Sequence, residues 1–215
     1  ESVASARIEG NRTTVVGAAI DSLESEKPAE NEDFQELRNI RKAIEFVEST
    51  VGSKDKHPIS PSLLRELQKI ITEGLTRDGS KTPGAWRSGP VKILQSAHTP
   101  PEHVEVPQLM QELCDYIEND NEGKLDIIKI AIAHHRFAAI HPFDNGNGRT
   151  ARLLTYAMLV KAEFIDKSKR TVLNPSAIFC IDRQRYYDML AKADSFSEKG
   201  LEDWCHYVAQ GIAAE

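Results

Sequence analysis

Residues 141–152 read HPFDNGNGRTAR, and this run decides the local fold and the chemistry around it. A histidine opens the run, two glycines flank an asparagine in its second half, and two arginines follow. An apolar, helical-looking stretch precedes it from Leu125 to Ile140, and another follows from Arg152 to Val160. The pattern predicts a helix, a tight glycine loop and a second helix that begins near Gly148.

Such a loop is suited to hold a polyphosphate. Glycine permits positive φ and close approach of a ligand, so successive N–H groups can converge on an anionic oxygen at the positive end of the helix. Arg149 and Arg152 both lie in the first turn, where guanidinium groups suit phosphate oxygens, and Asn147 can donate to the same anion. His141 is a candidate proton acceptor at the lip. The alternative is an ordinary turn with solvated arginines, which the density of the run disfavours.

The run resembles the signature of the Fic family, H-x-F-x-(D/E)-G-N-G-R-x-x-R. One position departs from it, because Asn145 stands where the family usually has an acidic residue that binds Mg²⁺, and a carboxylate comes one place earlier at Asp144. An amide oxygen can still ligate Mg²⁺, but without the charge. The remaining positions match: His141, Phe143, Gly146, Asn147, Gly148, Arg149 and Arg152.

The resemblance implies a mainly α fold, a Fic-like helical bundle with a small β-hairpin flap over the active site. It also implies transfer of AMP from ATP to a Ser, Thr or Tyr hydroxyl of a target protein. His141 would be the base, Asn145 would help to hold Mg²⁺, and Phe143 would be a buried anchor that turns His141 toward the site. Gly148 favours AMP transfer in this resemblance, because the phosphorylating Doc branch of the family has Lys at the corresponding position.

In this interpretation the catalytic residues would be His141, Asn147 and Arg149. In-line attack at phosphorus needs a base, a metal and donors around the developing charge, which these residue types supply. The phosphates would meet an anion hole and both arginines: Gly146, Asn147, Gly148, Arg149 and Arg152.

A second motif, SARIEG at residues 5–10, resembles the inhibitory sequence (S/T)-x-x-x-E-(G/N) of the family. Glu9 lies one helical turn after Ser5, and Gly10 is placed to end a short helix. The resemblance implies a class II member, with an inhibitory helix in residues 1–30 before a catalytic domain at 31–215. Glu9 would then pair with Arg152 and take it from the γ-phosphate. A plain helix end is the alternative interpretation.

A third feature is the turn-rich PGAWRSGP at residues 83–90, followed by strand-like residues 91–94. It predicts a short β-hairpin and resembles the Fic flap, G-x-W/Y-R followed by V-x-I. Such an edge can pair with an extended peptide, so Trp86, Val91 and Ile93 would dock the target. An ordinary surface hairpin is the alternative.

The adenine side is indicated by Tyr186, Tyr187 and Leu190, which resemble the Y-Y-x-x-L stretch of the family. Either tyrosine could stack on the base, and either could belong to the core. His134 or His135 is expected to be a hydrogen-bonded structural histidine on an apolar helix face.

Apolar spacing predicts further helices, and the β-branched region 7–17 is ambiguous between helix and strand. The predicted helices are 32–49, one opened by Pro61, 106–117, 182–193 and 201–212.

Composition fits one enzyme domain of 215 residues with a single core. A net charge of −6 argues against general nucleic-acid binding, and no apolar run is long enough to span a membrane. Three cysteines without a C-x-x-C pair favour reduced thiols and a cytoplasmic setting. The expected partners are ATP, an unidentified target protein and, in a homodimer, a second copy of this chain. Alternatives to AMP transfer are AMP removal, transfer of another phosphate-containing group, and a nucleotide-binding regulatory module with weakened catalysis.

Overall fold

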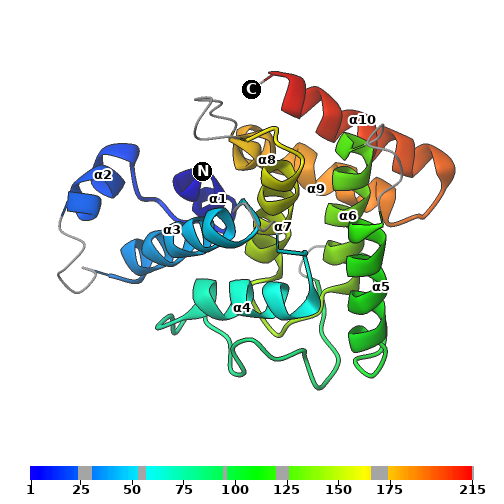
Figure 1. Ribbon diagram of the computed structural model, residues 1–215, viewed down its shortest axis with the longest axis horizontal. Helices are drawn as coiled ribbons and strands as arrows, with labels where there is room; N and C mark the ends of the chain where they lie inside the picture. The colour runs from blue at the N-terminus through cyan, green and yellow to red at the C-terminus, as the bar shows by residue number, and fades with distance from the viewer. Residues whose placement is uncertain (24–30, 53–56, 94–95, 120–125, 166–173, 215) are drawn as a thin grey trace.

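The computed structural model describes residues 1–23, 31–52, 57–93, 96–119, 126–165 and 174–214. This part of the chain is a bundle of helices (Figure 1). The helices are α1 (Ser2–Ile8), α2 (Val15–Leu23), α3 (Glu32–Thr50), α4 (Pro61–Thr72), α5 (Val106–Glu118), α6 (Asp126–Ile140), α7 (Asn147–Lys161), α8 (Pro175–Ile181), α9 (Arg183–Ala193) and α10 (Glu198–Ala214).

Helix α7 is the centre of the bundle. It contacts α1, α3, α4, α6 and α8, and Figure 1 shows α3 and α4 on one side of it with α6 and α10 on the other. Its residues from Arg149 to Val160 are all buried, as expected for a helix that is covered on every side. The motif therefore stands at the start of the most buried helix, which fixes its position.

Capping explains where two of the predicted helices begin. The Asn31 side chain accepts from the Phe34 N–H at the start of α3, and Ser60 accepts from the Leu63 N–H at the start of α4. Pro61 follows at the first helical position of α4, as predicted. The predicted helices at 32–49, 106–117, 182–193 and 201–212 are likewise confirmed within a few residues.

The ambiguous region 7–17 is helical only at its two ends, with a turn and an irregular stretch over residues 9–14 and no strand. Helix α1 ends at Ile8, and α2 begins at Val15 despite its β-branched neighbours, with an ion pair from Asp21 to Arg38 of α3. Ala6 and Ile8 join the same core as the rest of the bundle. The predicted domain boundary after residue 30 lies outside the described residues.

The β-hairpin flap is not confirmed. None of the described residues is in a strand, and residues 83–93 form turns and an irregular stretch. A strand needs a neighbouring ladder for its N–H and C=O groups, whereas here the Arg87 N–H donates to Pro142 O at 2.9 Å. The segment is docked on the motif loop instead, and Leu94 lies outside the described residues.

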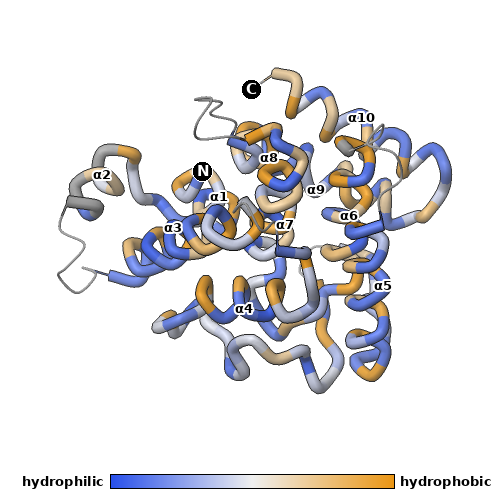
Figure 2. Tube along the Cα trace, in the orientation of Figure 1, coloured by the Kyte–Doolittle hydropathy of each residue, from blue (hydrophilic) through white to orange (hydrophobic). Residues whose placement is uncertain are grey.

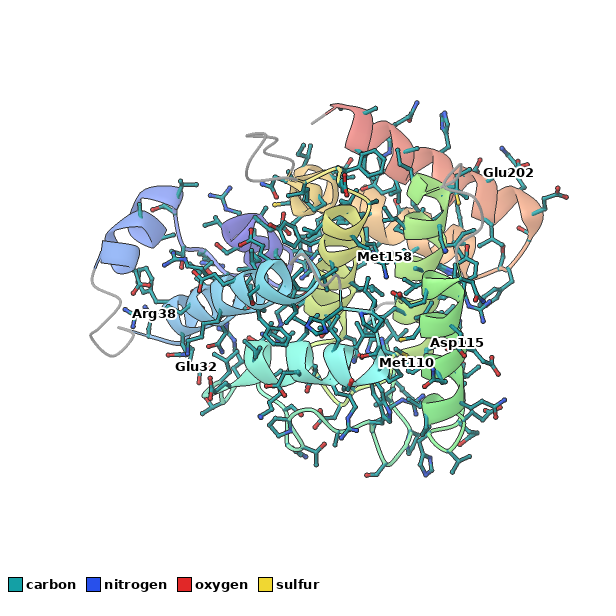
Figure 3. The ribbon with its side chains drawn as sticks, in the orientation of Figure 1. Glu32, Arg38, Met110, Asp115, Met158 and Glu202 are labelled. Carbon is teal, nitrogen blue, oxygen red and sulfur yellow. The ribbon has the colours of Figure 1, made fainter. Side chains whose placement is uncertain are left out.

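Polarity follows this architecture. In Figure 2, hydrophilic and apolar residues alternate along α3 and α5, which have one face on the core. Figure 3 shows Met110 and Met158 in the interior between helices, while Asp115 and Glu202 extend outward. Within the described part, the helices are too short or too polar to cross a membrane.

Candidate active site

The motif loop turns sharply between α6 and α7. His141 has a φ of +49° and Gly146 a φ of +80°, so both lie in the left-handed region. Glycine adopts this region at little cost, whereas for histidine it costs roughly 1–3 kcal/mol. The turn at His141 therefore has to be held by its surroundings.

Arg87 stabilises the backbone at this turn through hydrogen bonds. Its Nε donates to His141 O at 2.9 Å and its Nη2 to Ile140 O at 3.4 Å, while Nη1 donates to Gly89 O at 3.1 Å. The side chain is buried, and burial lowers the pKa of Arg87. A cation against the last carbonyls of α6 also complements the negative end of that helix. Arg87 thus stabilises the left-handed backbone at His141.

The His141 ring is arranged as a neutral base. Its Nδ1 lies 3.3 Å from Ala138 O, and because a carbonyl only accepts, this nitrogen carries the proton. Nε2 is then the acceptor. Burial lowers the pKa of His141 to about 4, so the ring is unprotonated near neutral pH.

The side chain of Asn147 forms hydrogen bonds with the backbone of the motif loop. Its Oδ1 accepts from the Phe143 N–H and its Nδ2 donates to Phe143 O, both at 2.9 Å. Phe143 is fully buried, as predicted, with its ring 4.9 Å from that of Trp86. The Asn147 amide is therefore used on the backbone, and an anion would meet the N–H groups of the α7 N-terminus, where no side chain forms a cap.

Arg152 is held by α1. Its Nη2 donates to Glu9 Oε1 at 2.7 Å and to Ser5 O at 3.1 Å, and its Nε donates to Ser5 Oγ at 3.0 Å. Burial favours the neutral acid of Glu9, yet the charge and hydrogen bond of Arg152 bring the pKa of Glu9 below its ordinary value. Gly148 makes room for this pair, since a Cβ there would lie 2.7 Å from Glu9 Oε1. Gly10 ends the segment with a φ of +97°.

Arg149 is held from the other side. Its Nη1 donates to Glu36 Oε1 of α3 at 3.1 Å and its Nη2 to Asp78 O at 2.6 Å. Glu36 is buried and also accepts from Asn11 Nδ2 at 2.8 Å. Burial raises the pKa of Glu36, in contrast to Glu9. In the described chain, Arg149 Nε has no hydrogen-bond partner.

The side-chain amide of Asn145 forms two hydrogen bonds, one through its oxygen and one through its nitrogen. Its Oδ1 accepts from the Gly146 N–H at 2.7 Å, and its Nδ2 donates to Gly79 O at 3.1 Å. The Asp144 carboxylate accepts from Ser80 Oγ at 2.6 Å and from the Lys81 N–H at 2.8 Å. The described residues contain no group of three or more His, Cys, Asp or Glu that could hold a metal ion. Asn145 Oδ1 keeps a second lone pair, which fits one neutral ligand for a cation.

The two tyrosines have different environments. Tyr186 is buried in an aromatic cluster with Phe179 and Trp204, and its hydroxyl lies 2.9 Å from His134 Nε2. Tyr187 is about a third exposed, under the guanidinium of Arg183. His134 is a structural histidine, as predicted: it is buried, and burial lowers its pKa to about 3.

These groups surround one cavity of about 600 Å³. Ser5, Gly10, Trp86 and Val91 lie outside its lining. The predicted site residues that line it are Glu9, Ile93, His141, Asn145, Gly146, Asn147, Gly148, Arg149, Arg152, Tyr186 and Tyr187.

Three residues of the site were not among the predicted ones. Arg87 holds the His141 turn, Glu36 pairs with Arg149, and Gln68 donates to Asn145 O at 3.1 Å while accepting from the Gly84 N–H at 2.6 Å. A signal existed for two of them. Glu36 lies four residues before Ile40, and Gln68 lies four after Leu64, so each is a polar residue on an apolar helix face.

Comparisons with known proteins agree with this geometry. The sequence profile of the Fic/DOC family matches residues 58–159. A protein adenylyltransferase Fic of Nematostella vectensis is 28% identical over 190 residues, which are 87% of this chain and 41% of that protein. A probable protein adenylyltransferase of Aquifex aeolicus is 25% identical over 179 residues, 82% of this chain and 50% of that protein. The chain thus spans half or less of the length of these relatives.

A solved structure gives the same result for the fold. A Fic family protein of Desulfovibrio desulfuricans superposes with a TM-score of 0.72 at 27% identity, covering 99% of this chain and 63% of that one. With the motif, the helical bundle and these matches together, the chain contains a Fic/DOC domain, matched over residues 58–159.

Proposed function

We propose that this chain is a protein adenylyltransferase that moves AMP from ATP to a hydroxyl side chain of a target protein, with Glu9 as an autoinhibitory residue. The observation that carries the proposal is the cavity in which a neutral His141 faces the N-terminus of α7 and the two motif arginines. Relatives named protein adenylyltransferase support it at the level of the family.

The base is the first part of the mechanism. The target hydroxyl oxygen attacks the α-phosphorus, the bond from that phosphorus to the bridging oxygen of the β-phosphate breaks, and pyrophosphate leaves. His141 Nε2 takes the hydroxyl proton, since Nδ1 is already committed to Ala138 O. A pKa of about 4 keeps His141 ready to accept at neutral pH.

The phosphates are the second part. The uncapped N–H groups at the start of α7 and the positive end of that helix suit their oxygens. Arg152 lines the cavity and would add its charge once Glu9 has released it. Arg149 is committed to Glu36 and Asp78 O, so its contribution is mainly the fixed positive charge beside the phosphate region.

Mg²⁺ is the expected cofactor, bound with ATP. Asn145 would offer one neutral oxygen, so most ligands would come from phosphates and water. When bound, the ion would stabilise charge on the leaving pyrophosphate.

Inhibition by Glu9 follows from the pairing with Arg152. While Glu9 and Ser5 occupy the guanidinium, it cannot turn toward a γ-phosphate. The helix α1 would therefore set whether ATP binds in a productive pose.

The test is incubation of the wild type, Glu9→Gly and the double variant Glu9→Gly with His141→Ala, each with ATP and Mg²⁺, followed by intact mass. One added AMP on Glu9→Gly and none on the double variant supports both roles. AMP on the double variant would refute His141 as the base. No AMP on any protein, with ATP bound, would refute self-modification and leave a candidate target to be supplied in a second assay.

Removal of AMP is the second candidate, because Glu9 lines the same cavity as His141 and could orient a water. AMP-labelled Glu9→Gly would be mixed with a small amount of the wild type. Loss of the label, and its retention with His141→Ala, would favour this activity.

A further inference from the structure

The tight loop of residues 78–81 is attached by four hydrogen bonds to three residues of the motif. Arg149 Nη2 donates to Asp78 O, and Asn145 Nδ2 donates to Gly79 O. The Asp144 carboxylate receives the other bonds, from Ser80 Oγ and from the Lys81 N–H. Each residue of the loop therefore has a partner in the motif.

The chemistry of these bonds requires an amide at position 145. Gly79 O is an acceptor and needs a donor opposite it, which the Asn145 NH₂ group provides at 3.1 Å. A carboxylate has only acceptors, so it would face the carbonyl with like partial charge. Position 144 instead needs a group that only accepts, because the partners of Asp144 are an O–H and an N–H group. The order of Asp before Asn thus matches the order of donors and acceptors in the loop.

The loop itself has little room to adjust. A Cβ at Gly79 would lie 1.9 Å from Leu75 O, so the backbone turns too tightly for a side chain. On its N-terminal side, Glu32 accepts from the Thr76 N–H at 2.9 Å and from the Arg77 N–H at 3.2 Å. The segment is therefore anchored at residues 76–77 by α3 and at residues 78–81 by the motif.

We propose that residues 78–81 are a latched wall of the active site, and that Asn145 is a positioning residue that holds this wall through Gly79. The latch needs no nucleotide, because its bonds join protein groups alone, and it stands independently of the activity proposed above.

The latch has two consequences for the site. It fixes Asp78 O, against which Arg149 is oriented, and so the wall sets the direction of the first motif arginine. It also separates the main cavity from a second hollow of about 380 Å³, since Asp144 and Asn145 line both while Gly79, Ser80 and Lys81 line the second. An Asp at position 145 would gain charge for a cation but lose the wall, which gives a physical reason for Asn in this chain.

The experiment is limited trypsin digestion of the full chain without nucleotide, with the rate of cleavage after Lys81 followed by fragment mass. Asn145→Asp should raise this rate about tenfold, because a lost bond that leaves Gly79 O unpaired favours local opening. Ser80→Ala removes the bond to Asp144 and the bond that Ser80 Oγ accepts from the Thr82 N–H at 3.1 Å, but it keeps Gly79 O paired with Asn145. It should raise the rate about threefold.

The matched control is Asn31→Asp, the same chemical change at the exposed N-cap of α3, where Asp also accepts from the Phe34 N–H. It should leave cleavage after Lys81 unchanged. Equal rates in wild type and Asn145→Asp would overturn the proposal. So would an equal rise at every tryptic site, since that reports global unfolding. Should Asn145→Asp fail to fold, an unchanged rate in Ser80→Ala would overturn the proposal by itself.

Discussion

The two motif arginines lie three residues apart on α7, yet the regions that hold them differ. On the α1 side, Arg152 is held by Glu9, whose side chain is 31% exposed. On the α3 side, Arg149 is held by Glu36, whose side chain is 3% exposed, and by the backbone of the loop 78–81. The pKa of Glu9 is lowered, while burial raises the pKa of Glu36.

The difference separates a releasable contact from a permanent one. Both arginines are 2% exposed, so the difference lies in the carboxylates. Glu9 can move from Arg152 into solvent, whereas Glu36 is enclosed and cannot leave Arg149 without carrying its charge through the interior. The Arg152–Glu9 pair is therefore suited to regulation, and the Arg149–Glu36 pair is suited to holding the fold together.

The largest expected effect comes from removing Glu36, the buried partner of Arg149. Glu36→Ala should lower the free energy of unfolding by about 3–5 kcal/mol, because it leaves Arg149 buried without its carboxylate. Glu9→Ala, its counterpart on the α1 side, should lower it less, because Arg152 keeps its bonds to Ser5 O and Ser5 Oγ, whereas Glu36→Ala also removes an acceptor of Asn11 Nδ2. Urea denaturation of both variants measures this; similar losses would remove the distinction between the two sides.

The next effect is a loss of folding stability at acidic pH. His134 and His141 have pKa values of about 3 and about 4, below the ordinary 6.5, so the unfolded chain binds more protons between pH 4 and 6.5. Stability should therefore fall as pH drops through this window, by about 2 kcal/mol for each histidine at pH 5. Urea midpoints at pH 7 and pH 5 test this, with His134→Gln expected to show a smaller loss between the two.

A third prediction tests release on the α1 side. Glu9→Gly should raise AMP transfer about tenfold or more, within the usual range of coupling between a regulatory and an active site. Ser5→Ala should raise it less, because Glu9 still holds Arg152. Initial rates with labelled ATP measure both, and a rate in Glu9→Gly equal to that of the wild type would contradict inhibition by Glu9.

The smallest effect is expected at the adenine side. Tyr187 is at the cavity rim and Tyr186 in the core, so Tyr187→Ala should weaken ATP binding about three- to tenfold with little loss of stability, as for the loss of one stacking or cation–π contact. Calorimetric titration with ATP tests it. No change in affinity would show that Tyr187 does not contact the base.

Much of this arrangement is predictable from sequence. Helices with clear caps and apolar spacing, such as those begun by Asn31 and Ser60, follow from local rules. The turn around Gly146 and the gathering of His141 with the arginines also follow, because one short run carries them.

The rest depends on partners distant in sequence. The hairpin prediction from residues 83–94 is not confirmed, since strand-like residues need a ladder and this segment bonds to the motif loop instead. The amide of Asn147 has a donor for an anion in principle, but the fold uses it on Phe143. Arg87 gathers carbonyls from three parts of the chain, which no local pattern predicts.

The most direct test of the comparison uses one isosteric change on each side, Glu9→Gln and Glu36→Gln, with initial rates of AMP transfer measured side by side. Each variant keeps the shape and removes the charge. A higher rate is expected in Glu9→Gln and no gain in Glu36→Gln. A gain in Glu36→Gln, or a loss in Glu9→Gln, would contradict it.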